Sequence, residues 1–158
     1  KGEIFSIIEQ VEKDENIKID EKAKEALFNI SGGDARRLGN ILQSSASISK
    51  DITEEIIYSM ASVARPKEID EVLKLAIANK FIDARNKLMD VMLNYGLSGM
   101  DIIKQIQQEI LKLDLNNESK MLLMEKCGEI EFRMTEGSDE FIQLEALLSQ
   151  FVLYGSKK

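Results

Sequence analysis

The chain has 158 residues, a formal net charge of −7 and 44% apolar residues, which fits one or two small globular domains rather than a disordered segment. It contains no histidine and one cysteine, which excludes imidazole catalysis, a His/Cys zinc site and an internal disulfide. No apolar run approaches the ~20 residues of a membrane span, and no signal peptide is recognisable. We therefore expect a cytoplasmic protein of a reducing compartment, with no metal and no membrane partner.

The acidic charge is spread evenly along the chain. Residues 1–65 carry 9 basic and 12 acidic side chains, and residues 66–158 carry 12 and 16. A surface that binds duplex DNA neutralises phosphates with lysine and arginine, and neither half offers such a basic surface. Direct DNA binding by this chain is therefore disfavoured.

The first 65 residues predict four short helices. Apolar residues recur at helical spacing, and N-cap residue types stand before three of the helices, at Asp20, Asp34 and Thr53. The glycine pair at 32–33 is expected to end the second helix. The apolar stripes are Ile4, Ile7, Ile8 and Val11; Ala23, Ala26, Leu27 and Ile30; Leu38, Ile41 and Leu42; and Ile56, Ile57 and Met60. These helices predict a compact first domain with a boundary near Ala64.

Apolar residues at helical spacing predict five further helices from Pro66 onward. The first of them begins at Pro66, because proline suits the first turn of a helix. Gly96 ends the sixth helix, Ser98 and Asp101 form a capping box for the seventh, and Asn117 is expected to cap the eighth. The apolar stripes of the fifth to eighth helices are Ile69, Val72, Leu73, Ala76 and Ile77; Phe81, Ala84, Leu88, Val91 and Met92; Ile102, Ile103, Ile106 and Ile110; and Met121, Leu122, Met124, Cys127 and Ile130.

The last predicted helix, residues 138–154, carries too many apolar residues for one face. They are Phe141, Ile142, Leu144, Leu147, Leu148, Phe151, Val152 and Leu153. Because they spread around most of the circumference, the helix is either central in its own bundle or covered by another chain. We favour the second possibility. The oligomer interface is predicted at Phe141, Ile142, Leu148, Phe151 and Val152.

Helical patterns without strand alternation predict an all-α fold. The sequence also lacks a G-x-x-x-x-G-K-[ST] loop, an apolar strand ending in paired acids, and a G-x-G-x-x-G motif. This chain alone therefore cannot build a phosphate cradle with a magnesium site. We expect it, by itself, neither to bind ATP nor to act as an enzyme.

One segment, Ser31–Arg37 with the sequence SGGDARR, could carry chemistry. An arginine in a first helical turn, beside free backbone N–H groups, is well placed to bind a phosphate. Alternatively, Asp34 only caps the helix and pairs with Arg37 in a surface contact worth about 0.3 kcal/mol. Consecutive helical residues point roughly 100° apart, so Arg36 and Arg37 cannot both serve one phosphate.

Four segments resemble, in the same order, the C-terminal half of the small subunits of archaeal replication factor C, the sliding-clamp loader of the AAA+ family. They are residues 30–43 (ISGGDARRLGNILQ), 64–66 (ARP), 95–99 (YGLSG) and 136–151 (EGSDEFIQLEALLSQF). The first motif is shared by the lids of several AAA+ ATPases, whereas the last two are more particular to clamp loaders. The resemblance spans nearly the whole chain.

The resemblance implies an AAA+ lid in residues 1–64 and, in residues 65–158, the helical collar that joins subunits into a ring-like pentamer. It implies that Arg36 is the sensor-2 arginine, which touches the terminal phosphate of ATP held by a core outside this chain. The implied partners are the other small subunits and a large subunit. Through the full complex they include the sliding clamp and primer–template DNA, and the full-length subunit would be an AAA+ ATPase.

Two other functions remain open. The chain could be a self-contained helical scaffold or adaptor with no nucleotide partner, in which Asp34 is only a helix cap. It could also be a small helical DNA-binding module, which the acidic charge disfavours. Cys127 has helical spacing with Ile130 and Met134, so we predict a small core residue rather than a reactive thiol.

Overall fold

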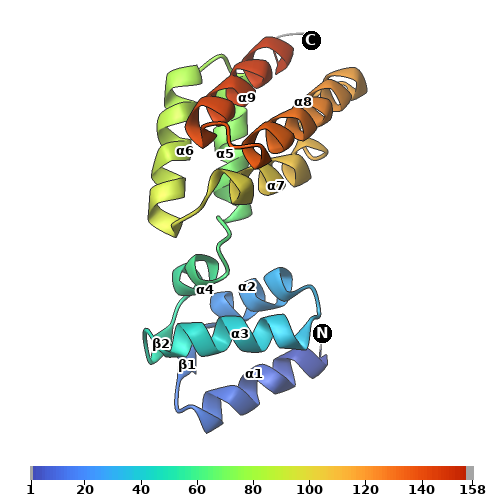
Figure 1. The fold of residues 1–158 in the computed structure, drawn as a ribbon. Helices are drawn as coiled ribbons and strands as arrows, with labels where there is room; N and C mark the ends of the chain where they lie inside the picture. The colour runs from blue at the N-terminus through green and yellow to red at the C-terminus, as the bar shows by residue number, and fades with distance from the viewer. Residues whose placement is uncertain (1, 156–158) are drawn as a thin grey trace. The chain divides into compact units, whose positions relative to one another are not determined.

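A computed structural model describes residues 2–155 and divides the chain into two compact units, residues 1–62 (the first unit) and residues 63–158 (the second unit). Over the described residues the fold consists of nine α-helices and two strands of two residues each (Figure 1). The all-α prediction is therefore confirmed.

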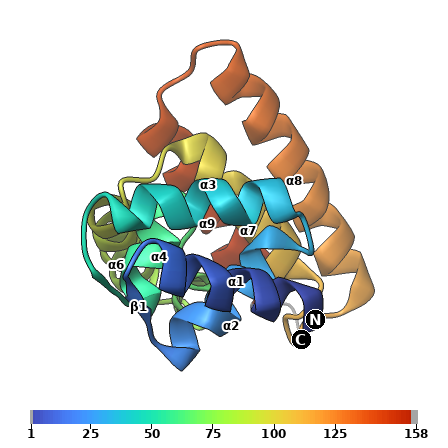
Figure 2. The same ribbon diagram turned by 90° about the horizontal axis from the view of Figure 1, so that it is seen from below.

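The described part of the first unit holds four helices and one strand pair (Figure 2). They are α1 (Gly2–Asp14), β1 (Lys18–Ile19), α2 (Glu21–Ser31), α3 (Ala35–Ala46), β2 (Asp51–Ile52) and α4 (Glu54–Met60). Helix α2 packs against α1, α3 and α4, and α3 also packs against α4. The predicted stripes supply most of the core, with Ile4, Ile8, Ala23, Ala26, Leu27, Leu38, Ile41, Leu42 and Ile57 buried. One apolar face per helix therefore suffices to build this unit.

The strand pair departs from the sequence prediction, which contains no strand. Lys18 pairs with Asp51 and Ile19 with Ile52, in parallel. The two isoleucines are buried and their neighbours Lys18 and Asp51 are exposed. Two residues are too few to display a period-2 alternation, so the pairing has no recognisable signal in the sequence.

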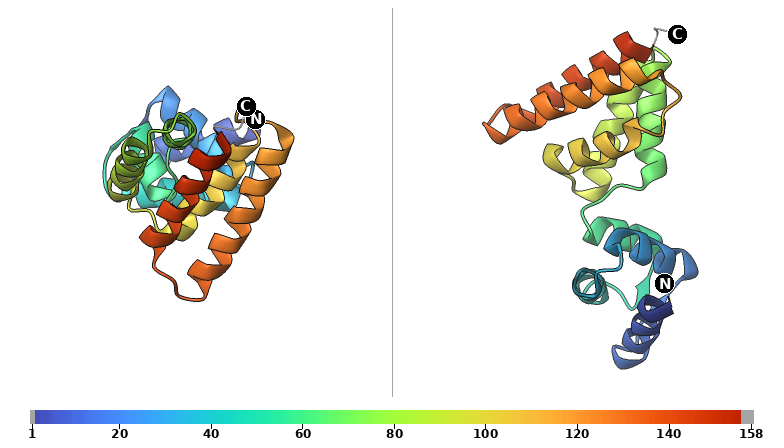
Figure 3. Two further views of the ribbon diagram at one scale, coloured as in Figure 1. Left: turned by 90° about the horizontal axis from the view of Figure 1, so that it is seen from above. Right: turned by 90° about the vertical axis from the view of Figure 1, so that its right-hand side faces the viewer.

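The described part of the second unit is a bundle of five helices. They are α5 (Pro66–Ile77), α6 (Phe81–Tyr95), α7 (Gly99–Ile110), α8 (Asn117–Thr135) and α9 (Glu140–Gly155). Helix α5 packs against α6 and α7, α7 packs against α8, and α9 packs against all four others. Figure 3 shows α8 and α9 side by side in opposite directions, and these two helices are in direct contact.

Helix α9 is the central helix of the second unit. Leu144, Leu147, Leu148 and Phe151 are buried, and the last three have an exposed fraction of 0%. Because four helices surround α9, apolar residues on several of its sides are covered within one chain. The interface prediction is therefore wrong at Leu148 and Phe151, which belong to the core of their own unit.

The helix caps agree with the sequence at most positions. In the predicted capping box, the Ser98 hydroxyl accepts a hydrogen bond from the Asp101 N–H at 3.2 Å, and Asp101 Oδ2 accepts one from the Ser98 N–H at 2.9 Å. The N-cap of α8 is Asn116 rather than the predicted Asn117, since Asn116 Oδ1 accepts from the Ser119 N–H at 2.7 Å. Two adjacent asparagines are equally suited to this role, so residue type does not fix the register.

Candidate functional site

The turn between α2 and α3 carries the first candidate site. Gly32 and Gly33 have φ angles of 59° and 89°, in the left-handed region that glycine adopts without strain. The N–H of Asp34 donates to the carbonyl oxygen of Ser31 at 3.0 Å. The turn thereby places Asp34 at the N-cap of α3.

Asp34 binds backbone groups of the two arginines. Its Oδ1 accepts hydrogen bonds from the N–H of Arg36 at 2.9 Å and of Arg37 at 3.1 Å. Both arginine side chains are exposed, and neither forms an ion pair within residues 2–155. The predicted cap is therefore confirmed, whereas the alternative Asp34–Arg37 ion pair is not formed in the described chain.

Arg36 lies in the first turn of a 12-residue helix whose opposite face is buried. Leu38, Ile41 and Leu42 anchor that face in the core of the first unit. The backbone of Arg36 is thus held in place while its guanidinium reaches solvent. The first-turn N–H groups of Arg36 and Arg37 are already bonded to the Asp34 carboxylate, so the exposed guanidinium of Arg36, rather than the helix end, is the group that favours an anion here.

The predicted oligomer interface divides into exposed and buried residues. Phe141 and Ile142, in the first turn of α9, are exposed by 44% and 65%. Val152 is half-buried and packs against the core. Leu148 and Phe151 contribute no surface. Phe141 and Ile142 therefore form the solvent-facing part of this set.

Three helices of the second unit carry exposed apolar pairs, two residues spaced eleven apart. The pairs are Ile82 and Leu93 on α6, Met121 and Phe132 on α8, and Ile142 and Leu153 on α9, each residue more than half exposed. Eleven residues advance a helix by about 1,100°, which returns to within about 20° of the starting direction. Each pair therefore lies on one helix face. Sequence reasoning missed the pair on α6 because it followed only the stripe that faces the core. It also placed Met121 in the apolar stripe of α8, which is wrong because Met121 is 55% exposed.

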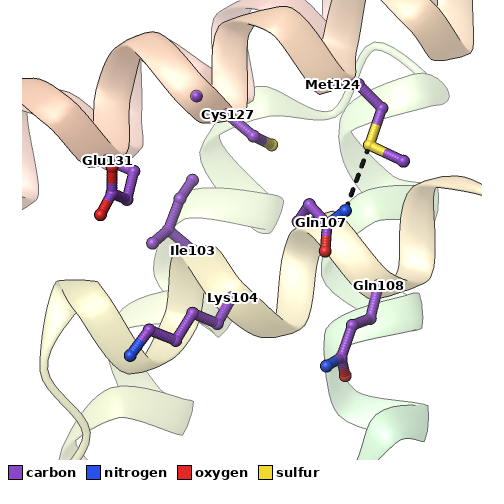
Figure 4. Close-up of a pocket in the computed structure, with 8 residues that line it drawn as sticks. Ile103, Lys104, Gln107, Gln108, Met124, Cys127 and Glu131 are labelled. Carbon is purple, nitrogen blue, oxygen red and sulfur yellow. Dashed lines mark hydrogen bonds between the residues drawn. The ribbon is translucent and has the colours of Figure 1, made fainter.

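A groove of about 480 Å³ runs between α7 and α8 (Figure 4). Gln107 Nε2 donates to the sulfur of Met124 at 3.5 Å, which links the two helices. Lys104 and Glu131 lie toward the same end of the groove in Figure 4, and Cys127 is one of its lining residues. The groove therefore combines charged, amide and sulfur-containing side chains.

Cys127 is buried, and desolvation raises the pKa of its thiol from 9.0 to about 12. The thiol is consequently protonated at neutral pH, whereas the thiolate is the nucleophilic form. The prediction of a core residue is confirmed, and the α7–α8 groove gains no nucleophile from Cys127.

Ion pairs join α6 to its neighbours in the bundle. Arg85 on α6 pairs with Glu145 on α9. Lys87 Nζ lies 2.8 Å from Glu71 Oε2 on α5, and the hydrogen bond from Lys87 lowers the pKa of Glu71. Both pairs are partly exposed, so they orient α6 more than they stabilise it.

Two kinds of feature are absent from residues 2–155. No group of three or more His, Cys, Asp or Glu side chains in this range could hold a metal ion. None of the described helices is long and apolar enough to cross a membrane.

Known proteins match nearly the whole chain. The family "Replication factor C C-terminal domain" matches residues 64–150. A replication factor C small subunit from Methanocella arvoryzae is 44% identical over 156 residues, which cover 99% of this chain and 48% of that protein. The small subunit from Staphylothermus marinus is 42% identical over 159 residues, again 99% of this chain and 48% of the relative.

A third relative has a different length. The replication factor C small subunit from Pyrococcus horikoshii is 41% identical over 156 residues, which cover 99% of this chain but 18% of that protein. The chain spans about half the length of the first two relatives. The family match covers more than half of the chain, from the residue before the N-cap of α5 into α9. The chain therefore belongs to the replication factor C family, as its resemblance to clamp-loader small subunits implied.

Proposed function

We propose that this chain is the lid and collar part of a clamp-loader small subunit. The first unit, residues 1–62, is the lid of an AAA+ ATPase whose nucleotide-binding core lies outside these 158 residues. The second unit, residues 63–158, is the collar that joins subunits into a pentameric loader in the cytoplasm. The loader places a sliding clamp on primer–template DNA. Family membership supports the clamp-loader assignment. The exposed guanidinium of Arg36 is the main observation that supports a nucleotide-sensing role for the lid.

Arg36 is the proposed sensor of the nucleotide. Its guanidinium has no ion-pair partner among the described residues, so it is available for a charge-assisted hydrogen bond to the terminal phosphate of ATP. This contact exists only while that phosphate is present, and it therefore gives the lid two positions of different energy. Loss of the phosphate on hydrolysis changes the position of the lid.

Exposed apolar surface supports the collar assignment. Large apolar side chains that are more than half exposed recur on α6, α8 and α9, and contacts with neighbouring subunits would cover them. Ring assembly is heterologous, so each subunit needs two different contact faces. Three helix faces with exposed apolar pairs meet this requirement. Phe141 and Ile142 remain interface residues in this proposal.

Clamp loading by the complete loader tests the lid assignment. Arg36→Ala in the full-length small subunit should slow ATP-driven clamp loading on primed DNA by tenfold or more, about 1.4 kcal/mol. Arg37→Ala is the matched control, because it removes the same charge one residue away and should cost little. Equal effects of the two changes would contradict the sensor role. A self-contained adaptor would show no effect of either change.

A further inference from the structure

The start of the second unit is held by a side chain from α7. Gln105 Oε1 accepts a hydrogen bond from the N–H of Ala64 at 2.9 Å, and Gln105 Nε2 donates to the carbonyl oxygen of Ala64 at 2.9 Å. The carboxamide thus binds both backbone groups of one residue, as a neighbouring strand would. Ala64 itself is 0% exposed and belongs to the core.

This double contact requires a glutamine at position 105. A carboxamide carries an acceptor and donors at the same end of the side chain. Glutamate would keep the acceptor without a donor, and methionine would offer neither. A buried N–H or C=O without a partner is unfavourable, so Gln105 holds the backbone of Ala64 in place.

The chain immediately before Ala64 is held less firmly. Helix α4 ends at Met60, and the N–H of Ser62 donates to the carbonyl oxygen of Ser59 at 3.1 Å. Ser62 has a φ of 52°, in the left-handed region that is uncommon for residues other than glycine. Val63 forms no backbone hydrogen bond to another described residue. Two residues with bonded backbone groups, Ser62 and Ala64, therefore flank one without.

We propose that Ser62 and Val63 form the joint between the two units, and that Gln105 is the positioning residue that confines motion to this joint. Rotation about ψ of Ser62 and about φ of Val63 breaks none of the backbone hydrogen bonds described above. Rotation within Ala64 would break the two hydrogen bonds to Gln105. Beyond Ala64, Pro66 fixes its own φ and opens α5. The second unit therefore begins to behave as a rigid body at Ala64, and hinge motion falls on the residues before it.

The joint has a use that rests on the proposed function. A lid that changes position with the state of ATP must turn without disturbing the packing of the collar. Because Gln105 holds Ala64 in the collar core, lid movement is absorbed at Ser62 and Val63 and α5 keeps its contacts. Gln105 thus separates the nucleotide-dependent unit from the assembly unit.

Backbone NMR on the 158-residue chain without nucleotide tests the joint independently of the role of Arg36. In the wild type, the order parameter S² should be about 0.85 at Ala64 and below about 0.6 at Val63. After correction for intrinsic rates, the amide hydrogen of Ala64 should exchange at least about tenfold more slowly than that of Val63. Equal exchange at the two residues would overturn the proposal, and this comparison requires no variant.

Gln105→Met tests the positioning residue. It keeps the length of the side chain, removes both hydrogen bonds, and should accelerate exchange at Ala64 at least about tenfold, while Ile69 and Ile106 keep their protection. Gln108→Met, on an exposed position of the same helix, is the matched control and should leave Ala64 unchanged. Unchanged exchange at Ala64 in Gln105→Met would overturn the role of Gln105.

Discussion

Gly99 and Glu140 are in direct contact: the N–H of Gly99 donates to Glu140 Oε2 at 3.0 Å, and a Cβ at position 99 would lie 2.8 Å from Glu140 Cβ. The same Cβ would lie 3.0 Å from the sulfur of Met134. The contact joins the first turn of α7 to the first turn of α9. Glycine is therefore needed at position 99 because neighbouring atoms approach the backbone closely.

Gly99→Ala should destabilise the second unit by about 1–3 kcal/mol, because the added methyl group forces α7 and α9 apart. Gly128→Ala is the matched control, since it lies within α8 with no atom within 4 Å of the added Cβ. That control should stabilise the unit by about 0.5–1 kcal/mol through helix propensity. Urea unfolding followed by circular dichroism measures both. Wild-type stability for Gly99→Ala would show that the contact can relax.

Phe151→Ala should destabilise the second unit by about 3–5 kcal/mol, because Phe151 is one of the largest fully buried side chains of the chain. Phe141→Ala, on the exposed first turn of α9, should cost less than about 1 kcal/mol. Equilibrium unfolding in urea distinguishes the two. A Phe151→Ala variant that keeps the wild-type stability and loses only self-association would contradict the burial of Phe151 in its own unit.

The stability of the second unit should fall in alkaline solution because of Cys127. Burial raises the pKa of its thiol from 9.0 to about 12, so above pH 9 the unfolded chain releases a proton that the folded chain retains. This contribution to stability is fully present below pH 9 and is lost as pH rises toward 12. The free energy of unfolding should fall by up to about 1.4 kcal/mol per pH unit in that window.

Cys127→Ala provides the reference, because it lacks the titrating group and keeps all the others. Urea unfolding at pH 8, 9 and 10 compares the two chains. The stability advantage of the wild type over Cys127→Ala should shrink above pH 9. An advantage that stays constant across this range would contradict the raised pKa of the thiol.

Ile142→Glu should weaken association of the chain with itself, because it places a charge within an exposed apolar pair of α9. Leu111→Glu is the control: Leu111 is exposed to a similar extent but belongs to no such pair. Light scattering at a protein concentration of hundreds of micromolar measures the size of the assembly, and circular dichroism measures helicity. We expect a smaller assembly with unchanged helicity for Ile142→Glu alone. A wild type that is strictly monomeric under these conditions would contradict self-association through this face.

The sequence predicted local features of the fold well. Asp20, Asp34 and Ser98 act as the N-caps that their residue types indicated, and most residues of the apolar stripes are buried or partly buried, with Met121 as an exposed exception. Such features depend on residues close together in the chain, so a short window contains the whole signal. The free side chain of Arg36 could also be anticipated, since it lies outside the apolar stripe of α3.

Long-range features could not be predicted in the same way. The apolar residues of α9 show that the helix is covered on several sides, but not whether the covering helices come from its own chain. The choice of a second chain was therefore wrong for Leu148 and Phe151, which four helices of the same unit bury. The contact between Gln105 and Ala64 joins residues far apart in sequence, and neither residue type indicates that the contact forms.

The affinities of the full-length subunit for ATP and ADP test most directly whether Arg36 reads the terminal phosphate. The two ligands differ by the one group that Arg36 is proposed to bind, so Arg36→Ala should weaken ATP binding by about tenfold or more and change ADP binding less than about twofold. Arg37→Ala should leave both affinities at the wild-type values. Equal losses for ATP and ADP in Arg36→Ala, or no loss for either, would contradict the assignment of Arg36 as the sensor of the nucleotide.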